Sequence, residues 1–263
     1  MDTHRRHRRL FLIAALGAVV PAARAQGSPA VVVNAASRLA MLAERMGKLN
    51  AQVGRDVLAA RSRRALIETS ADFEKGLREA TAAASTFELR ENYKLLRVLW
   101  NEYRPLALGR STVEGARKLA PRTEEVAWIA LKGARLQHDE SRSREGALVM
   151  IAGGARAASQ RLARLHLLRG WALPPTAGAR EIPAAEQEII LALEQLKGER
   201  ETGEDGIQTL AVAESQLAFL RQAAERLVQG KDRATQLEHI AKSADYVAEA
   251  LDRVAKVYES IKI

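Results

Sequence analysis

The sequence predicts an all-α protein built as two tandem up-and-down four-helix-bundle units related by internal duplication. Ala, Leu, Arg and Glu are the most frequent of the 263 residues, while aromatic side chains make up only 4%. This balance is typical of helical proteins, and we find no convincing alternation of polar and apolar residues that would predict a strand. No proline lies between Pro29 and Pro105, so long helices are permitted there. The chain also repeats itself.

The repeat relates residues 33–49 to residues 149–165 at a constant offset of 116. Arg45 aligns with Arg161, and Leu49 aligns with Leu165. The ends of the two copies also correspond, because residues 123–140 align with residues 243–260. Self-similarity at a fixed spacing indicates duplicated structural units. We therefore expect one helical unit over residues 26–142 and a second over residues 143–263.

Each unit contains four stretches with helical periodicity. In the first unit we expect helices at residues 30–60, 64–84 and 89–103, the third ending before Pro105, and a fourth that begins at 113 or 123 and ends near 140. In the second unit we expect helices at residues 145–173, 184–200, 206–229 and 234–261, with a solvated turn at residues 199–206. Four consecutive helices per unit fit an up-and-down bundle.

The first 25 residues have the composition of a secretory signal peptide. A basic stretch of four arginines precedes an apolar run at residues 10–20, and Ala23-Arg24-Ala25 matches a small-x-small cleavage site. Residues 8–12 also resemble the twin-arginine export pattern, which leaves both export routes open. No later apolar run approaches the roughly 20 residues of a spanning helix. We expect a periplasmic protein with no transmembrane segment in its mature chain.

Composition argues against several classes of function. Removing the signal lowers the net charge from +9 to +5, and no long run of like charges remains to bind nucleic acid. There is no cysteine to form a disulfide or act as a nucleophile. His138, His166 and His239 are too widely spaced for a metal pair, and no nucleophile or phosphate-loop motif is present. We therefore predict a protein that is not an enzyme and has no cofactor or metal.

Arg156 is the most informative residue for function. It lies within residues 147–171, where nearly every helical face is apolar or small, and a desolvated guanidinium there requires an anionic partner. Gly153 and Gly154 precede it by one turn and would let a ligand or another helix approach the backbone. A bound anion is one partner. The alternative is a carboxylate from a neighbouring helix, for example Glu186, Glu188 or Glu194.

The first predicted helix carries two contrasting stripes. Asn34, Arg38 and Arg45 lie on one polar line at 100° per residue. A second stripe consists only of small residues, which let helices approach closely: Ala36, Ala40, Ala43, Gly47 and Ala51.

These two stretches resemble the PilJ-type family, the N-terminal region of type IV pilus methyl-accepting chemotaxis transducers. Its signature is similar to I-N-x-A-G-R-Q-R-M-L-S-Q-R-M-A-K, and the matching residues are Val33-Asn34, Ala36, Arg38, Met41-Leu42, Arg45-Met46 and Lys48 in the first copy and Ala152-Gly153, Arg156, Ser159-Gln160-Arg161 and Ala163 in the second. The second copy is also similar to the sensory segment of nitrate and nitrite sensor kinases. That resemblance implies that Arg156 binds the anion and that Gly153 gives backbone access. The first copy departs from the pattern, with Ala40 at the arginine position and Ser37 at the glycine position.

The leading hypothesis is an exported module that binds or senses a small oxyanion such as nitrate or nitrite, without an output domain of its own. Arg156 from one unit would face Arg38 or Arg45 from the other, with the anion between them. Ion pairing with nearby carboxylates is the alternative for Arg38 and Arg45. The candidate ligand-binding residues are Arg156, Gly153, Gly154, Arg38, Arg45 and Asn34.

The alternative function is a periplasmic interaction module that docks on an envelope receptor, a transporter or a pilus or chemosensory component. Under that hypothesis the small-residue stripe and residues 165–171, with His166 and Trp171 among leucines, would form the docking surface. Packing inside the fold is the other explanation for both features.

Overall fold

The structure is a computed structural model that describes residues 28–174, 176 and 178–261. Within these residues the chain forms eight α-helices and one short 3₁₀ helix, and the only β-type pairing is an isolated bridge between Arg169 and Leu173. The all-α prediction is confirmed, while the expected signal peptide at residues 1–25 lies outside the described residues. The helices are α1 (Pro29–Gly54), α2 (Ala59–Ala83), α3 (Phe87–Leu108), α4 (Val113–Ser141), α5 (Arg144–Leu168), α6 (Glu181–Lys197), α7 (Gly203–Val228) and α8 (Arg233–Glu259), with the 3₁₀ helix at Arg200–Thr202.

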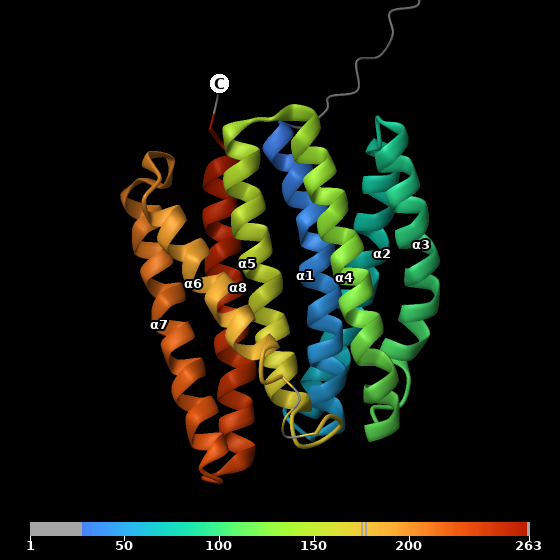
Figure 1. The fold of residues 1–263 in the computed structure, drawn as a ribbon, viewed down its shortest axis with the longest axis vertical. Coiled ribbons are helices and arrows are strands. Elements are labelled where there is room, and N and C mark those ends of the chain that lie inside the picture. The colour runs from blue at the N-terminus through green and yellow to red at the C-terminus, as the bar shows by residue number, and fades with distance from the viewer. Residues whose placement is uncertain (1–27, 175, 177, 262–263) are drawn as a thin grey trace, which may run out of the picture.

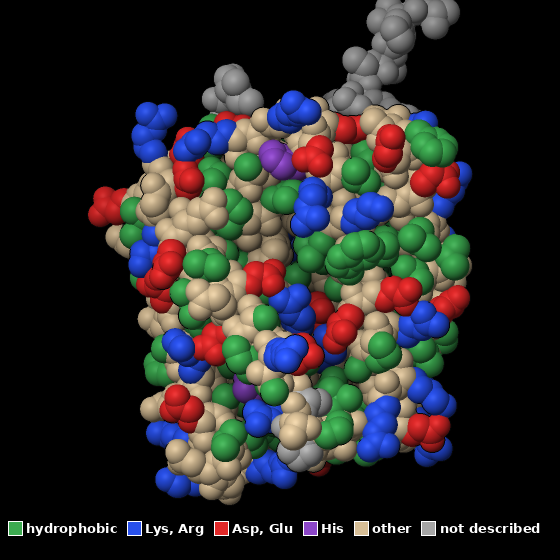
Figure 2. Space-filling model, in the orientation of Figure 1, with side chains coloured by type: hydrophobic (Ala, Val, Ile, Leu, Met, Phe, Trp, Pro, Cys, Tyr) green, Lys and Arg blue, Asp and Glu red, His purple; other side chains and the backbone are tan. Residues whose placement is uncertain are grey.

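Two long helices, α1 and α5, lie side by side at the centre of the molecule (Figure 1). Helix α1 also packs against α2 and α4, whereas α5 also packs against α6 and α8. Helices α3 and α7 lie at opposite edges, with α3 against α4 and α7 against α8. Any residue on the facing surfaces of α1 and α5 is therefore enclosed by helices on several sides. None of the described helices is long and apolar enough to cross a bilayer. Figure 2 shows acidic and basic side chains interspersed over the face of the molecule seen in Figure 1.

Apolar side chains hold the two sides of this arrangement together. One large cluster fills the space among α1 to α4, and another fills the space among α5 to α8 with contributions from the start of α1. In the first cluster the rings of Phe73 and Trp100 stack with centroids 4.2 Å apart, and the Tyr103 hydroxyl donates to the Ala43 carbonyl at 2.7 Å. Burying a large apolar side chain contributes about 1.5–3 kcal/mol, so these clusters supply the main stabilising term.

The small-residue stripe of α1 is buried along its whole length. The missing side chain at Gly47 makes room for a neighbouring helix, because a Cβ there would lie 2.7 Å from Cδ of Arg164 on α5. Small residues thus bring α1 and α5 close enough for polar side chains to reach across the contact.

Several helix boundaries differ from those expected. The prediction that the third helix ends before Pro105 is wrong, because α3 continues to Leu108. Proline removes one hydrogen bond near the end of this helix, and the freed carbonyl belongs to Asn101, which is exposed to water. Helix α4 begins at the earlier of the two expected positions, where the Thr112 hydroxyl caps it by accepting from the Gly115 amide at 3.1 Å. Helix α5 ends at Leu168, shortly before Gly170 turns the chain with φ +70°.

Candidate functional site

Arg156 lies in the middle of α5 and is completely buried at the junction of α1, α5 and α8. Its Nη1 donates to Oδ1 of Asp252 on α8 at 2.5 Å. Its Nη2 donates to Oδ1 of Asn34 and, at 3.0 Å, to the Ser37 hydroxyl, both on α1. Burial lowers the pKa of Arg156, and the carboxylate of Asp252 opposes that effect. The guanidinium therefore joins three helices at one point.

Asp252 is the centre of a group of cations. Besides Arg156, its Oδ1 faces Nη1 of Arg38 at 3.4 Å, and its Oδ2 faces Nζ of Lys256 at 3.2 Å. Burial alone would raise the pKa of Asp252, but the charges of Arg156 and Arg38 outweigh it and the pKa is lowered. Arg38 and Arg156 thus come together with a negative charge between them, and that charge belongs to a side chain of the protein.

The carboxylates suggested as partners of Arg156 all lie on α6, which is the wrong helix. Glu188 on α6 pairs with Arg161, and Glu186 pairs with Arg221. The side chain of Arg156 points toward α1 and α8, so α6 lies on the other side of α5 and its carboxylates do not reach the guanidinium. A carboxylate does pair with Arg156, but it is supplied by Asp252 of α8.

The two candidate glycines lie in different surroundings. A Cβ at Gly153 would lie 2.5 Å from Cβ of Ser37, so this glycine is required for the close approach of α1 to α5. A Cβ at Gly154 would meet only Oε1 of Glu188, at 3.7 Å. Gly153 is therefore next to Arg156 in space, but Ser37 occupies the room that a ligand would need. Gly154 lies away from the junction.

Asn34 and Arg45 take different positions around the junction. Asn34 is buried and bridges two charged groups, because its Oδ1 accepts from Arg156 and its Nδ2 donates to Glu259 at 2.8 Å. Arg45 contacts a second carboxylate on α8, with 3.2 Å between its Nη1 and Oδ1 of Asp245. Of the six candidates, Arg156, Asn34, Arg38 and Gly153 gather at Asp252, whereas Arg45 lies beside Asp245.

Asp245 is the anchor of a second buried ion pair. Nζ of Lys48, a fully buried lysine on α1, lies 2.5 Å from Oδ1 of Asp245. Burial lowers the pKa of Lys48, and the neighbouring cations lower the pKa of Asp245 despite its burial. Close by, Nε2 of Gln160 on α5 donates to the Ala244 carbonyl at 3.1 Å.

A third buried pair lies on the opposite side of the central helices. Nε of Arg164 on α5 donates to Oε2 of Glu44 on α1 at 2.8 Å, and its Nη2 reaches Oε1 of Glu124 on α4 at 3.2 Å. Burial would lower the pKa of Arg164, but the two glutamates outweigh burial and the pKa is raised. Buried ion pairs therefore run along both sides of the contact between α1 and α5.

A crevice of about 280 Å³ opens beside Asp252 between α1 and α8. Its charged lining has an excess of cations, with five basic side chains against three carboxylates. These are Arg38, Arg45, Arg156, Arg253 and Lys256 on the basic side and Asp245, Glu249 and Asp252 on the acidic side. An anion in this crevice would meet a net positive environment in which Arg156 is the most deeply buried group.

Sequence reasoning missed the carboxylates that organise this site. Asp245, Glu249 and Asp252 follow one another at spacings of four and three residues, and Lys256 continues the same line four residues later. Such spacing places them on one face of a helix. This charged stripe on α8, opposite the polar stripe of α1, was the sequence signal from which these carboxylates could have been predicted.

Most of the residues expected to form a docking surface lie inside the fold. The small-residue stripe is covered by neighbouring helices, and Leu165, His166, Leu167 and Leu168 are all buried. Burial lowers the pKa of His166 to about 4, and the positive charge of Arg169 contributes. Arg169 and Gly170, at the end of the same stretch, are exposed, and Trp171 is partly buried against the apolar cluster that contains Leu167 and Leu168.

Fold and site together define an all-helical protein whose central helices are connected by buried ion pairs. Within the described part of the chain, no group of three or more His, Cys, Asp or Glu side chains is arranged to hold a metal ion. No protein-family model, curated protein or solved structure matches this chain.

Proposed function

We propose that this protein is an exported helical module that binds a small oxyanion of the nitrate or nitrite type at the junction of α1, α5 and α8. The observation that carries the proposal is the convergence of Arg38 and Arg156 on one carboxylate oxygen of Asp252. Two guanidinium groups so close together require a negative charge between them. Asp252 supplies that charge when no ligand is bound.

The geometry gives an anion a route to compete with Asp252. The Asp252 side chain is 21% exposed and forms part of the wall of the crevice, so solvent ions reach it. A planar oxyanion matches a guanidinium by charge-assisted contacts to two N–H groups. The anion would take over contacts that Arg156 and Arg38 now make with Asp252. Helix α8 would then lose its connection to α1 and α5, which couples binding to helix displacement.

The proposal includes the two-unit organisation, with α1 to α4 and α5 to α8 as up-and-down four-helix bundles of PilJ-type character related by duplication. The ion pairs support it. Lys48 and Arg164 are equivalent positions in the repeat, and each crosses to the last helix of the other unit, at Asp245 and Glu124 respectively. A shared origin explains why two equivalent cations exchange partners in this reciprocal way.

Calorimetry on the chain lacking residues 1–25 tests the proposal with sodium nitrate and sodium nitrite, and sodium chloride at equal ionic strength serves as the control. We expect saturable binding of nitrate or nitrite at millimolar concentrations and weaker binding of chloride. Arg156→Gln should abolish it, whereas Arg221→Gln, a basic residue paired with Glu186 away from the crevice, should leave it unchanged. Equal heats from the three salts would contradict the proposal.

A second variant keeps the proposal testable if Arg156→Gln fails to fold. Asp252→Asn removes the internal competitor while it preserves the shape of the side chain. We expect this variant to bind nitrate more tightly than the parent chain and to gain thermal stability when nitrate is added, because a ligand that binds only the folded state stabilises it. A stabilisation by chloride that equals that by nitrate would show a structural charge cluster without selectivity.

A further inference from the structure

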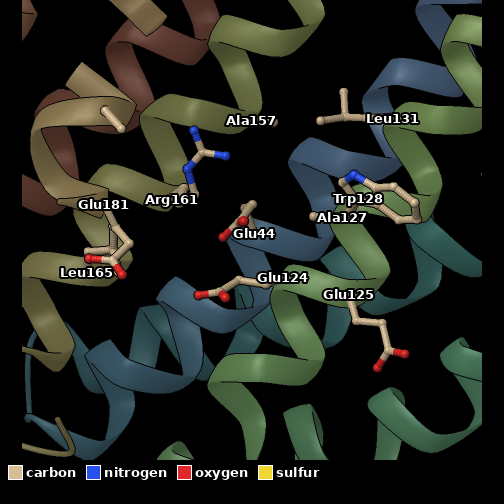
Figure 3. A pocket seen from close by; sticks show the side chains of 11 residues that line it. Glu44, Glu124, Glu125, Ala127, Trp128, Leu131, Ala157, Arg161, Leu165 and Glu181 are labelled. Atoms are coloured by element: carbon tan, nitrogen blue, oxygen red, sulfur yellow. The ribbon is translucent and has the colours of Figure 1, made fainter. Parts of the chain in front are cut away.

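A second and larger cavity lies on the other side of the central helix pair, among α1, α4, α5 and α6. Its volume is about 560 Å³, within the range of roughly 300–1,000 Å³ that is usual for small-molecule sites. It shares no lining residue with the crevice at Asp252. Figure 3 shows the side chains that line it.

The charge of this cavity is opposite to that of the crevice. Four carboxylates line it, from Glu44, Glu124, Glu125 and Glu181, against one guanidinium, that of Arg161. These side chains have partners outside the lining: Arg161 pairs with Glu188, Glu44 and Glu124 pair with Arg164, and Glu125 pairs with Arg122. With these partners included, five carboxylates stand against three guanidinium groups, so an excess of negative charge remains around the cavity. A cationic ligand is therefore attracted to the cavity, and an anion is repelled by it.

Glu44 is a buried acceptor that faces this space. Its side chain is only 3% exposed, and its Oε2 accepts from Arg164. Glu44 is also one of the residues that line the cavity. In Figure 3 the Glu44 carboxylate lies in the middle of the lining side chains, between Arg161 and Glu124. A carboxylate accepts strong, charge-assisted hydrogen bonds, so a ligand that brings an N–H group or a positive charge into the cavity gains by meeting it.

Trp128 forms an aromatic wall of the same cavity. It is 64% exposed, and no ring stacking or hydrogen bond connects its indole to the other described residues. Figure 3 places it with Leu131 on α4, across the cavity from Arg161 and Glu181. The face of an indole attracts ammonium groups, and the effect is strongest for tryptophan. Leu131 and Leu165 add apolar surface for the body of a ligand.

The cavity exists because small side chains line α4, α5 and α6 at Ala127, Ala157 and Ala184. The corresponding part of α1, 116 residues earlier, carries larger groups: Met41 stands at the position of Ala157, and Arg38 at that of Gly154. On one side of the central pair the larger side chains leave only a crevice of about 280 Å³, while the small side chains on the other side leave a cavity of about 560 Å³.

We propose that this cavity binds a small organic cation, a protonated or quaternary amine with a short apolar body. The carboxylates do not form a metal cage within the described residues, because no three of them approach a common point closely enough to hold an ion. A diffuse organic cation requires no such cage. It would place its charge between Glu44 and the other glutamates and its apolar body against Trp128 and Leu131. This proposal does not depend on anion binding at Asp252.

Calorimetry with choline and with 3,3-dimethylbutan-1-ol tests it on the same chain. The alcohol is the neutral isostere of choline, so it has the same shape without the charge. We expect saturable binding of choline at millimolar concentrations, weakened by added salt, and at least tenfold weaker binding of the alcohol. Benzyltrimethylammonium should bind more tightly than tetramethylammonium, because its ring adds apolar contact.

Two substitutions locate the binding. Trp128→Leu keeps an apolar side chain but removes the indole face, and it should weaken choline binding roughly fivefold. Glu125→Gln should weaken it by a similar factor, whereas Glu114→Gln, an exposed position on the same helix outside the cavity, should not. Both cavity positions are exposed or partly so, and circular dichroism verifies that the variants fold. Equal affinity for choline and its neutral isostere, or no saturable binding of either, would overturn the proposal.

Discussion

Glu44 on α1 and Arg164 on α5 form an ion pair that is buried from both sides, with 2.8 Å between Oε2 and Nε and side-chain exposures of 3% and 1%. It lies beside Gly47, where the missing side chain leaves room for Arg164 against α1. Together with the pair of Lys48 and Asp245, it fixes α1 against its neighbours through charges as well as apolar contacts.

We expect loss of either member of the buried pair of Glu44 and Arg164 to lower the free energy of unfolding. Arg164→Met leaves the Glu44 carboxylate buried without a counter-charge, and Glu44→Leu leaves most of the Arg164 charge uncompensated. Each single change should lower the free energy of unfolding by about 3–5 kcal/mol. The double variant should be much closer to the parent chain, because it removes both charges and keeps apolar volume.

Urea denaturation of the four chains measures this effect as a double-mutant cycle. Replacement of Lys118 and Glu114, an exposed pair on α4, provides the control and should change the stability by less than about 1 kcal/mol. Additive losses in the double variant would show that the two charges do not stabilise one another.

The neighbouring glycines of α5 predict opposite outcomes for the same substitution. Gly153→Ala forces a Cβ against Ser37 and should destabilise the protein by about 1–3 kcal/mol, the usual cost of overpacking. Gly154→Ala meets only ordinary contact with Glu188, and alanine is the better helix former by about 1 kcal/mol. Gly154→Ala should therefore leave stability unchanged or raise it. Thermal unfolding of both variants compares them, and a similar loss in each would contradict the assigned contact.

His166 predicts a pH dependence of stability. Burial, together with the charge of Arg169, lowers its pKa from 6.5 to about 4 in the folded state. Between these values the unfolded chain binds the proton and the folded chain does not. Stability therefore falls as the pH drops from about 6.5 toward 4, by roughly 3 kcal/mol in total for this group.

Denaturation at a series of pH values checks this slope. His166→Gln should flatten the dependence between pH 6.5 and 4, because no group at that position takes up a proton on unfolding. His239→Gln, which changes an exposed histidine on α8, should leave the slope as it is. A slope that His166→Gln does not change would place the titrating group elsewhere.

The sequence predicted the helices well because their signals are local. Apolar periodicity and the small stripe of α1 act within one segment, so they can be read without knowledge of neighbours. The sequence also indicated that Arg156 required a negative partner. It did not identify Asp252, because that pairing depends on which face of α5 meets α8. Charge alone left Glu188 equally acceptable, and only the packing of the helices separates the two.

At the junction we expect the shape of the Arg156 guanidinium, as well as its charge, to contribute to the stability of the protein. Arg156→Lys keeps a positive group that can contact Asp252. A single ammonium group, however, cannot also donate the hydrogen bonds that the second guanidinium nitrogen now donates to Asn34 and Ser37. Leaving these buried acceptors without a donor should destabilise the protein by about 1–3 kcal/mol. The matched change Arg38→Lys, at a side chain 48% exposed on the same carboxylate, should cost less than about 1 kcal/mol. Urea denaturation distinguishes the two, and equal losses would mean that Asp252 recognises charge alone.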